Sequence, residues 1–332
     1  MGEPDTLTPA APVTVLEAAR LAAAAQSAEL RRHAKAARKG KDPEAIHQMR
    51  VATRRMRAAL RALRFHVAAP KTLRARLTWL ARRLGAVRDH DVILTLLWSE
   101  RLPAAAAGER SRLAALIARL ARRRAKAHAR LADALRRPRY RKLLDDLAAF
   151  AERPRLLGGE EPVAARVLAE WSARLGEAIA ARPGMTLATP PADELHALRI
   201  DFKRLRYALE FHAAACGFSY DTERRLAREM QDVLGEIHDR DLLAGWLAGG
   251  AGGGGPFRGE WPALTRRLEA ERARRFRRFL QQRRAWRERT RPEQAAALTA
   301  EPRWAHLEPQ PVTLRLVTGT KTVASNQIKD EA

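Results

Sequence analysis

The chain has 332 residues, and its 63 lysines and arginines against 38 acidic residues give a formal net charge of +25 at pH 7. Such an excess repels itself, so we expect a polyanionic partner: nucleic acid, an anionic membrane surface or inorganic polyphosphate. Arginine outnumbers lysine, which favours phosphate because a guanidinium fork binds two phosphate oxygens at once. Hydrophobic residues make up 46% of the chain, enough for a packed core, which excludes a disordered polybasic tail as a description of the whole.

Three further features of the composition exclude classes of site and of location. Aromatic residues are only 5% of the chain, which argues against single-stranded nucleic acid, because its binders stack bases on aromatic rings. Cys216 is the only cysteine, so neither an internal disulfide nor a zinc site with several cysteines is expected. No signal-peptide pattern is recognisable and no apolar run reaches the ~20 residues of a membrane span, so we expect a cytoplasmic protein without membrane insertion.

Helical spacing of apolar residues, interrupted by glycine and proline, predicts an all-α fold. The first helix is expected to end at Gly40, after which Asp42 caps the next helix and Pro43 takes its first position. A glycine is expected to end the third helix as well, at Gly85. In the first half we predict helices over residues 13–39, 43–67, 70–84, a short one that reaches 102, 108–137 and 138–150.

The second half repeats this order. Residues 152–162, rich in proline, glycine and charge, are predicted to link a first half over residues 12–151 to a second half over residues 163–290. The length of the chain is enough for one large helical domain or for two bundles of ordinary size. The helices of the second half are predicted over residues 163–181, from 192 through the second motif, 218–234, 239–247 and 260–289.

Three segments fall outside these helices. Residues 1–11 have no helical period and form an N-terminal lead. Gly249–Gly255 is predicted to be a flexible loop, and it lacks the lysine and the hydroxyl residue of a P-loop, so we predict no nucleotide site there. Residues 291–332 form a C-terminal tail in which Val312–Val317 alternates like a β-strand.

One motif occurs twice: HQMRVATRRMRAAL from His47 to Leu60 returns as HALRIDFKRLRYAL from His196 to Leu209. Steps of three and four residues bring its basic side chains to one side of a helix, where they form a cationic stripe that borders the core face. A basic run is ordinarily a solvated helix face, but repetition with the same spacing favours a shared function. In the first copy the stripe is His47, Arg50, Arg54, Arg57, Arg61 and Arg64, and the core face is Ile46, Met49, Thr53, Met56, Leu60 and Leu63.

A second motif follows each copy. Leu84-Gly85 precedes Asp89 in the first half, and Leu234-Gly235 precedes Asp239 in the second. One interpretation is that each aspartate caps a helix after a glycine stop. The other is that each carboxylate turns toward the motif arginines and holds their guanidinium groups in place. The two interpretations are compatible, because one oxygen can cap while the other pairs.

Together the two motifs, over residues 12–289, resemble the CHAD domain, the conserved histidine α-helical domain. The resemblance implies two antiparallel helical bundles related by a pseudo-two-fold axis, with the basic helices facing each other across a central groove or channel that binds inorganic polyphosphate. It also implies association with polyphosphate granules. The family often carries a β-rich triphosphatase domain as well, and no such segment is recognisable here. By position, the polyphosphate-binding residues implied are His47, Arg50, Arg54, Arg57, His196, Arg199, Lys203 and Arg206.

Other residues are assigned supporting roles by the same match. Asp89 and Asp239 are expected behind the binding arginines. The halves differ, because Arg88 in the first corresponds to His238 in the second, and Arg61 corresponds to Glu210. Glu210 either weakens anion binding locally or braces an arginine. Arg55, Arg61, Arg64 and Arg204 are predicted to bind secondarily.

Three functions compete on this evidence. We favour a polyphosphate-binding protein without catalytic residues, metal or cofactor; divalent-ion co-binding and oligomeric state remain open. The alternative is nonspecific binding of duplex nucleic acid through the basic helices predicted over residues 108–137 and 260–289. A phosphoanhydride hydrolase is least favoured, because the available carboxylates show no metal-ligand pattern. The histidines His47 and His196 are either phosphate donors or buried structural residues. The carboxylates are Asp89, Asp91, Asp239, Asp241 and Glu210.

Overall fold

The computed structural model describes residues 13–40, 42–99, 107–217, 220–247 and 261–289. Within these ranges every regular element is helical, which confirms the all-α prediction. A single 3₁₀ turn, Pro183–Met185, joins α6 to α7. The α-helices are α1 Val15–Lys39, α2 Pro43–Ala62, α3 Lys71–Ser99, α4 Ala107–Ala134, α5 Pro138–Glu152, α6 Ala164–Ala180, α7 Ala192–Cys216, α8 Asp221–Leu247 and α9 Pro262–Arg289.

Local chemistry accounts for the junction between the first two helices. Gly40 ends α1 in the left-handed conformation, with φ of 69°, which glycine adopts without steric cost. The predicted start of α2 is confirmed, because the Asp42 side chain accepts a hydrogen bond of 2.8 Å from the Glu44 backbone N–H and Pro43 follows at the first position. The end of α2 was predicted too late: the helix stops at Ala62, so Arg64 lies in the turn beyond it.

The predicted glycine stops are wrong. Gly85 lies inside α3 and Gly235 inside α8, so neither Asp89 nor Asp239 caps a helix and no separate short helix follows. Buried apolar residues continue past both glycines, in α3 through Val87 to Leu97. This packing outweighs the cost of about 1 kcal/mol that glycine brings to a helix interior.

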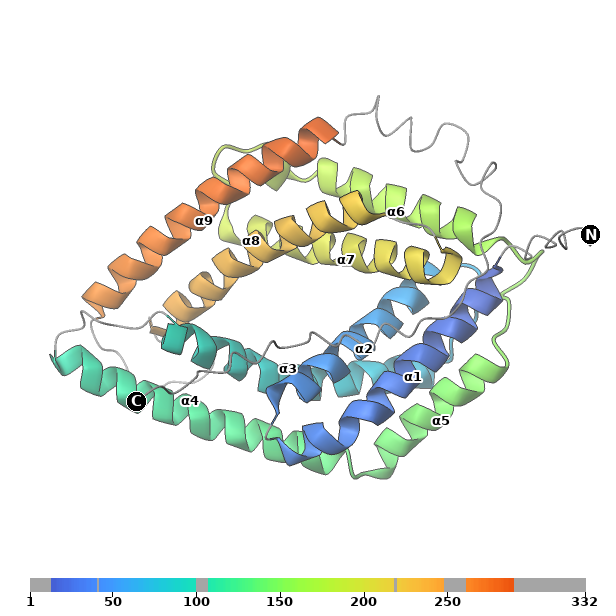
Figure 1. Cartoon of the computed structure of the whole chain (residues 1–332), viewed down its shortest axis with the longest axis horizontal. Coiled ribbons are helices and arrows are strands. Elements are labelled where there is room, and N and C mark those ends of the chain that lie inside the picture. The colour runs from blue at the N-terminus through green and yellow to red at the C-terminus, as the bar shows by residue number, and fades with distance from the viewer. Residues whose placement is uncertain (1–12, 41, 100–106, 218–219, 248–260, 290–332) are drawn as a thin grey trace, which may run out of the picture.

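The helices form two groups on opposite sides of the molecule, α1–α5 on one side and α6–α9 on the other (Figure 1). Helices that follow one another along the chain pack together, as α1 does on α2, α3 on α4, α7 on α8 and α8 on α9. Between the two groups α2 contacts α7, and α3 contacts α8. The motif helices are thus the elements that meet at the middle of the fold. A pseudo-two-fold relation between the groups remains a prediction.

Three apolar clusters hold this arrangement together. The first lies among α1–α5 around Met49 and Leu80, and extends to Leu168 of α6. The second, around Phe202 of α7, joins α6–α9. The third joins the two groups, since residues of α3 and α4 pack there against residues of α8 and α9: Ile93, Leu97, Leu116, Leu120, Leu243, Leu247, Trp261, Leu264 and Leu268. The predicted core face of the first motif is confirmed, because all six of its residues are buried.

Matched ion pairs connect the third and fourth helices of each half. Arg124 of α4 donates from Nε to Asp91 Oδ1 of α3 at 2.8 Å, and Arg272 of α9 donates from Nε to Asp241 Oδ1 of α8 at 2.5 Å. Asp91 and Asp241 occupy the same place in the second motif. Their arginine partners therefore align the sequence of α4 with the sequence of α9, so that Arg124 corresponds to Arg272.

Several predictions fall outside the described residues: the N-terminal lead, the Gly249–Gly255 loop, the part of the predicted short helix beyond Ser99, and the tail with its strand-like Val312–Val317. The division into halves at residues 152–162 stays a prediction. No helix of the described ranges is long and apolar enough to span a membrane.

The pair between Asp91 and Arg124 offers a test of what fastens α4 to α3. Asp91→Asn removes the anion beside a guanidinium that is only 23% exposed, so we expect the free energy of unfolding in urea to fall by about 1–3 kcal/mol. Asp133→Asn is the matched control, because its pair with Arg137 has the same 2.8 Å distance but both side chains are more than half exposed. There we expect less than about 0.5 kcal/mol. Equal losses for the two variants would contradict the role of Asp91.

Candidate functional site

The basic faces of the two motif helices meet around Tyr207. This buried residue of α7 has the Arg54 guanidinium of α2 at 5.3 Å from its ring centroid and the Arg206 guanidinium of α7 at 4.7 Å. An aromatic face attracts cations and can hold two of them that would otherwise repel each other. Tyr207 was not predicted as a site residue, although its position next to Arg206 in the second motif offered a signal.

Burial and like charge both act on the cations at this meeting point. The pKa of Lys203 is lowered to about 8, first by burial and then by neighbouring arginines, among which Arg199, Arg54 and Arg50 act most strongly. Burial likewise lowers the pKa of Arg54 and of Arg199. Arg50 and Arg54 come from α2, whereas Arg199 and Lys203 come from α7. The fold therefore brings these four predicted residues together, and we call them the central cluster.

The mid-helix glycines make room for two of these arginines. A Cβ atom added at Gly85 would lie 2.9 Å from Arg50 Nη1, and one added at Gly235 would lie 3.6 Å from Arg199 Nε. Arg50 and Arg199 thus each pass over the glycine of the helix that follows their own. At Gly85 the close approach of a side chain, and not a helix stop, explains the Leu-Gly step, whereas a Cβ atom at Gly235 would make only ordinary contact with Arg199.

The two predicted supporting aspartates lie unequally close to these arginines. Asp89 Oδ1 is 4.0 Å from Arg50 Nη2, and its side chain is 69% exposed, so the pair is loose. Asp239 is more deeply placed: burial raises its pKa, and the positive charge of Arg199 opposes that rise. Both carboxylates lie near the arginine of their own half, and that they hold these guanidinium groups in place stays a prediction.

Glu210 braces an arginine, which was one of its two predicted roles. Its Oε1 accepts from Arg206 Nη1 at 3.1 Å, and its Oε2 accepts from Arg55 Nε at 3.3 Å. Since Arg55 belongs to α2, this carboxylate also joins the two helix groups. Arg206 donates in addition from Nε to Gln231 Oε1 at 3.1 Å, and its side chain is only 15% exposed. Arg206 is therefore held by protein groups and has fewer donors left for a ligand than predicted.

The remaining predicted basic residues come from the last turns of α2, from the turn beyond it, and from α7. Burial lowers the pKa of Arg61, as do the charges of Arg204 and Arg57. Arg64, beyond the end of α2, has its guanidinium 4.5 Å from the ring centroid of Trp171 on α6. Arg204 donates from Nη1 to Asp201 at 2.8 Å. Of these residues, Arg64 and Arg204 already have protein partners.

The histidines differ between the halves. His196 Nδ1 lies 3.2 Å from His238 Nδ1, so one ring donates and the other accepts. Burial is the largest cause that lowers the pKa of His238, to about 4, and it also lowers the pKa of His196 and of His47. All three rings are therefore neutral near pH 7. In the first half Arg88 stands in place of His238 and lowers the pKa of His47 further. His238 was missed as a site residue, although its alignment with Arg88 was visible.

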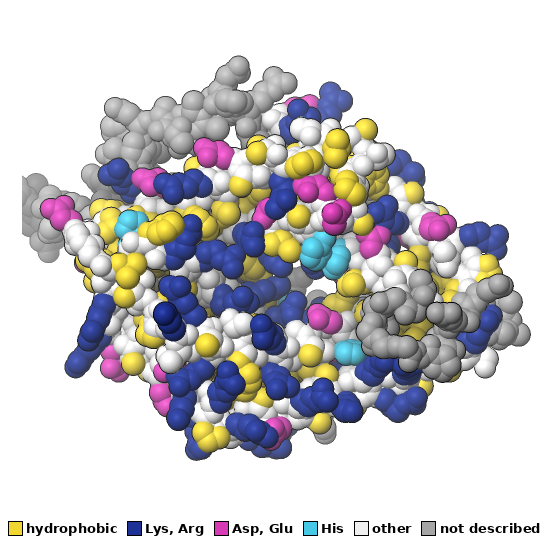
Figure 2. All heavy atoms as spheres, turned by 180° about the vertical axis from the view of Figure 1, so that it is seen from behind, with side chains coloured by type: hydrophobic (Ala, Val, Ile, Leu, Met, Phe, Trp, Pro, Cys, Tyr) yellow, Lys and Arg dark blue, Asp and Glu magenta, His cyan; other side chains and the backbone are white. Residues whose placement is uncertain are grey.

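Lysine and arginine side chains gather around a hollow in the middle of one face of the molecule (Figure 2). The chemistry of the central cluster suits an anion, because its members are basic, partly buried and close together, and because the ion pair of Arg50 with Asp89 is loose, at 4.0 Å. Among the residues that the structure describes, no group of three or more histidine, cysteine, aspartate or glutamate side chains could hold a metal ion.

A protein-family model decides what kind of domain this is: the CHAD domain model matches residues 21–248, more than half of the chain. The chain belongs to the CHAD domain family. The resemblance noted in its two motifs is thereby confirmed. Comparison with the curated proteins finds no match.

Solved structures agree with this CHAD assignment. The crystal structure of the CHAD domain from the plant Ricinus communis is 27% identical, with a TM-score of 0.58, and the alignment covers 92% of this chain and 97% of that one. PptA from Streptomyces chartreusis has the same fold at 21% identity, with a TM-score of 0.62 over 84% of this chain and 99% of that one.

The buried position of Lys203 predicts a pH dependence of stability. An unfolded chain keeps this lysine protonated up to ~10.4, whereas the folded site releases the proton near pH 8. Lys203 therefore contributes a free energy of unfolding that increases as the pH rises from about 8 to about 10. Lys203→Met should abolish this contribution and make the ligand-free protein more stable at pH 7.

Urea unfolding at pH 7 and pH 9.5 measures this effect as the difference between variant and wild type. The control is Lys126→Met, which removes an exposed lysine of α4 and should leave stability unchanged at both pH values. If the difference between Lys203→Met and wild type is the same at both pH values, Lys203 has an ordinary pKa and is not buried among cations.

Proposed function

We propose that this CHAD domain binds inorganic polyphosphate through the central cluster, and that it does so without chemical change of the ligand. The observation that carries the proposal is the convergence of Arg50, Arg54, Arg199 and Lys203 from two separate helix groups, with burial depressing the pKa of three of them. Folding alone gains nothing from placing like charges together. An anionic ligand that neutralises these charges accounts for the arrangement.

The helices supply the cations in a fixed geometry before the ligand arrives. Arg50 and Arg199 lie across glycines, and Arg54 lies over Tyr207, so binding does not have to order these side chains. Charge-assisted hydrogen bonds to phosphate oxygens then form at a small cost in entropy. Because the ligand removes repulsion as well as adding contacts, it should raise the stability of the protein substantially.

Polyphosphate suits this site better than duplex nucleic acid does. It is a flexible chain with about one charge per phosphate, and it can follow a row of cations between two helices, whereas a rigid duplex is about 20 Å wide and reaches only cations on an open surface. The polyphosphate binding implied by the CHAD resemblance supports the same choice. Association with polyphosphate granules in the cytoplasm is the cellular role we propose, with no metal or cofactor required and no phosphate released when Mg²⁺ is added.

The decisive test compares the loss of four central charges with the loss of four outer charges. The central variant carries Arg50→Gln, Arg54→Gln, Arg199→Gln and Lys203→Gln. The outer variant carries Arg110→Gln, Arg122→Gln, Arg136→Gln and Arg141→Gln, all exposed in wild type. Arg206 is left in place because Glu210 and Gln231 hold it.

Calorimetric titration with long-chain polyphosphate at two salt concentrations should show a Kd at least about a hundredfold weaker for the central variant, because four charge-assisted contacts are lost. The outer variant should lose less than about fivefold. Equal losses would mean that charge acts diffusely, and would sink the proposed site. A duplex DNA that competes with polyphosphate at equal phosphate concentration would favour the nucleic-acid alternative.

The two glycines provide a finer test, because they differ in the room that they leave. Alanine at either position favours the helix by up to about 1 kcal/mol. At Gly85 the new methyl group displaces Arg50, whereas at Gly235 it makes ordinary contact with Arg199. Gly85→Ala should therefore weaken polyphosphate binding by about tenfold, the value of one good contact, and Gly235→Ala should leave it nearly unchanged. Both variants should remain folded by circular dichroism. A reversed order of the two affinities would show that Arg50 does not act from this position.

A further inference from the structure

A second basic site, which we call the outer pocket, lies among three helices of the first half and shares no residue with the central cluster. A pocket of about 670 Å³ opens among α3, α4 and α5. Five of its ten lining residues are arginines and none is acidic. The arginines are Arg74, Arg82 and Arg83 of α3, Arg130 of α4 and Arg139 of α5.

These five arginines are not neutralised by the protein. Among the residues that the structure describes, none of them has an ion-pair partner, and all five are exposed. Elsewhere arginines of the same helices are paired, as Arg76 is with Asp146 and Arg124 is with Asp91. A concentration of unpaired cations in a concave site leaves their charge available to a ligand.

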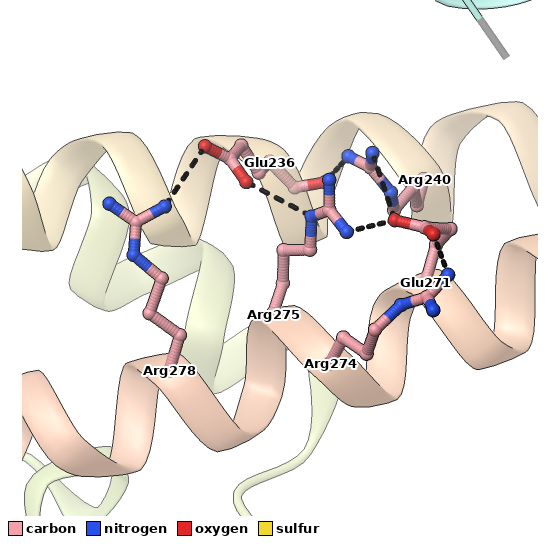
Figure 3. Close-up of polar contacts among 6 residues, drawn as sticks. All are labelled: Glu236, Arg240, Glu271, Arg274, Arg275 and Arg278. Atoms are coloured by element: carbon pink, nitrogen blue, oxygen red, sulfur yellow. Dashed lines mark hydrogen bonds and ion pairs between the residues drawn. The ribbon is translucent and has the colours of Figure 1, made fainter.

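At the equivalent place in the second half, carboxylates neutralise the arginines. The motif alignment and the ion pairs to Asp91 and Asp241 identify equivalent positions in the two halves. Glu236 is equivalent to Ala86, Arg275 to Ala127, and Arg278 to Arg130. At this place Glu236 accepts from Arg275 Nε at 3.1 Å and lies 3.6 Å from Arg278 Nη1 (Figure 3).

A second carboxylate completes this network. Glu271 of α9 pairs with Arg274 and Arg275, and lies 3.9 Å from Arg240 Nη2 (Figure 3). Two carboxylates thus neutralise the arginines between α8 and α9. In the first half alanine replaces Glu236 and Arg275, so the same place is open, and Arg130 remains without a carboxylate partner.

The pocket is not only cationic. The side chains of Ala75, Ala86 and Ala127 line it with methyl groups, and the half-buried indole of Trp79 adds an aromatic surface. The Arg139 guanidinium lies over this indole, 4.9 Å from the ring centroid. A planar guanidinium held on a ring is a surface on which a further aromatic ring stacks.

We propose that this pocket binds a nucleoside triphosphate, whose phosphates are held by the unpaired arginines and whose base stacks against Trp79 and Arg139. A ligand with both an aromatic ring and several phosphates uses the apolar and the cationic surfaces together. Inorganic polyphosphate uses only the latter. The proposal does not rest on polyphosphate binding at the central cluster.

The chain itself suggests the variant that tests this site. Ala86→Glu introduces the glutamate that stands at the equivalent position of the second half, Glu236. It places a carboxylate among Arg82, Arg83 and Arg130. Because Ala86 is exposed and glutamate favours helices, the variant should fold. Ala178→Glu, at an exposed position of α6, is the control with the same change in net charge. Both are titrated calorimetrically with ATP without Mg²⁺ at low salt, as is the central variant defined above.

We expect Ala86→Glu to weaken ATP binding by at least about tenfold, and the central variant and Ala178→Glu to bind as wild type does. Loss of ATP binding in the central variant, with Ala86→Glu unaffected, would place the nucleotide at the central cluster and overturn the proposal. These outcomes are independent of the polyphosphate titrations, so either proposal can fail alone.

A second comparison tests the role of the base, and it uses the central variant so that the central cluster does not bind the phosphates. This variant should bind ATP about tenfold more tightly than inorganic tripolyphosphate, and adenosine only weakly, because stacking adds to phosphate contacts. Adding Trp79→Leu to it should remove the preference for ATP and leave tripolyphosphate binding intact, which also shows that the protein is folded. Equal affinities of the central variant for ATP and tripolyphosphate would overturn the assignment of a nucleotide.

Discussion

Electrostatic repulsion between the two motif helices is the constraint on which the rest of the structure depends. The cations of α2 and α7 are brought together by apolar faces packed into separate cores, around Met49 in one group and Phe202 in the other. Burial of these faces compensates for the repulsion. Burial of Lys203, together with the repulsion from neighbouring arginines, lowers the pKa of this lysine to about 8. A protein built only for stability would place a carboxylate or an apolar residue here.

The protein neutralises positive charge selectively. Glu210 braces Arg206 and reaches Arg55 of the other helix group, and Glu236 and Glu271 neutralise the arginines between α8 and α9. Within the part of the chain that the structure describes, the arginines of the outer pocket of α3–α5 have no carboxylate partner, and the central cluster has only the loose pair of Arg50 with Asp89. On our proposals, this uneven distribution separates the arginines that fasten helices together from the arginines that bind a ligand. Net charge alone does not make that distinction, because both kinds contribute equally to it.

Predictions from the sequence failed, or missed a contact, where the role of a residue depends on a side chain of another helix. Gly85 was assigned to a helix end because glycine is a common helix terminator, but its reason is the Arg50 side chain of another helix. The hydrogen bond from Arg206 to Gln231 was not foreseen, because it joins two helices, and phosphate binding by Arg206 stays a prediction. The pairing of His196 with His238 was likewise hidden, since the two residues lie on different helices.

The sequence by itself determined the all-α class, the buried face of α2, the basic stripes and membership of the CHAD family. The first three features follow from helical periodicity, which is a local property of the chain, and the fourth from the resemblance of the two motifs to that family. Only the tertiary structure decided which cations meet and which are neutralised. An ion pair such as Arg55 with Glu210 joins residues far apart in sequence, and its formation depends on how whole helices pack. No local pattern specifies that packing, because apolar faces of similar composition can combine in more than one way.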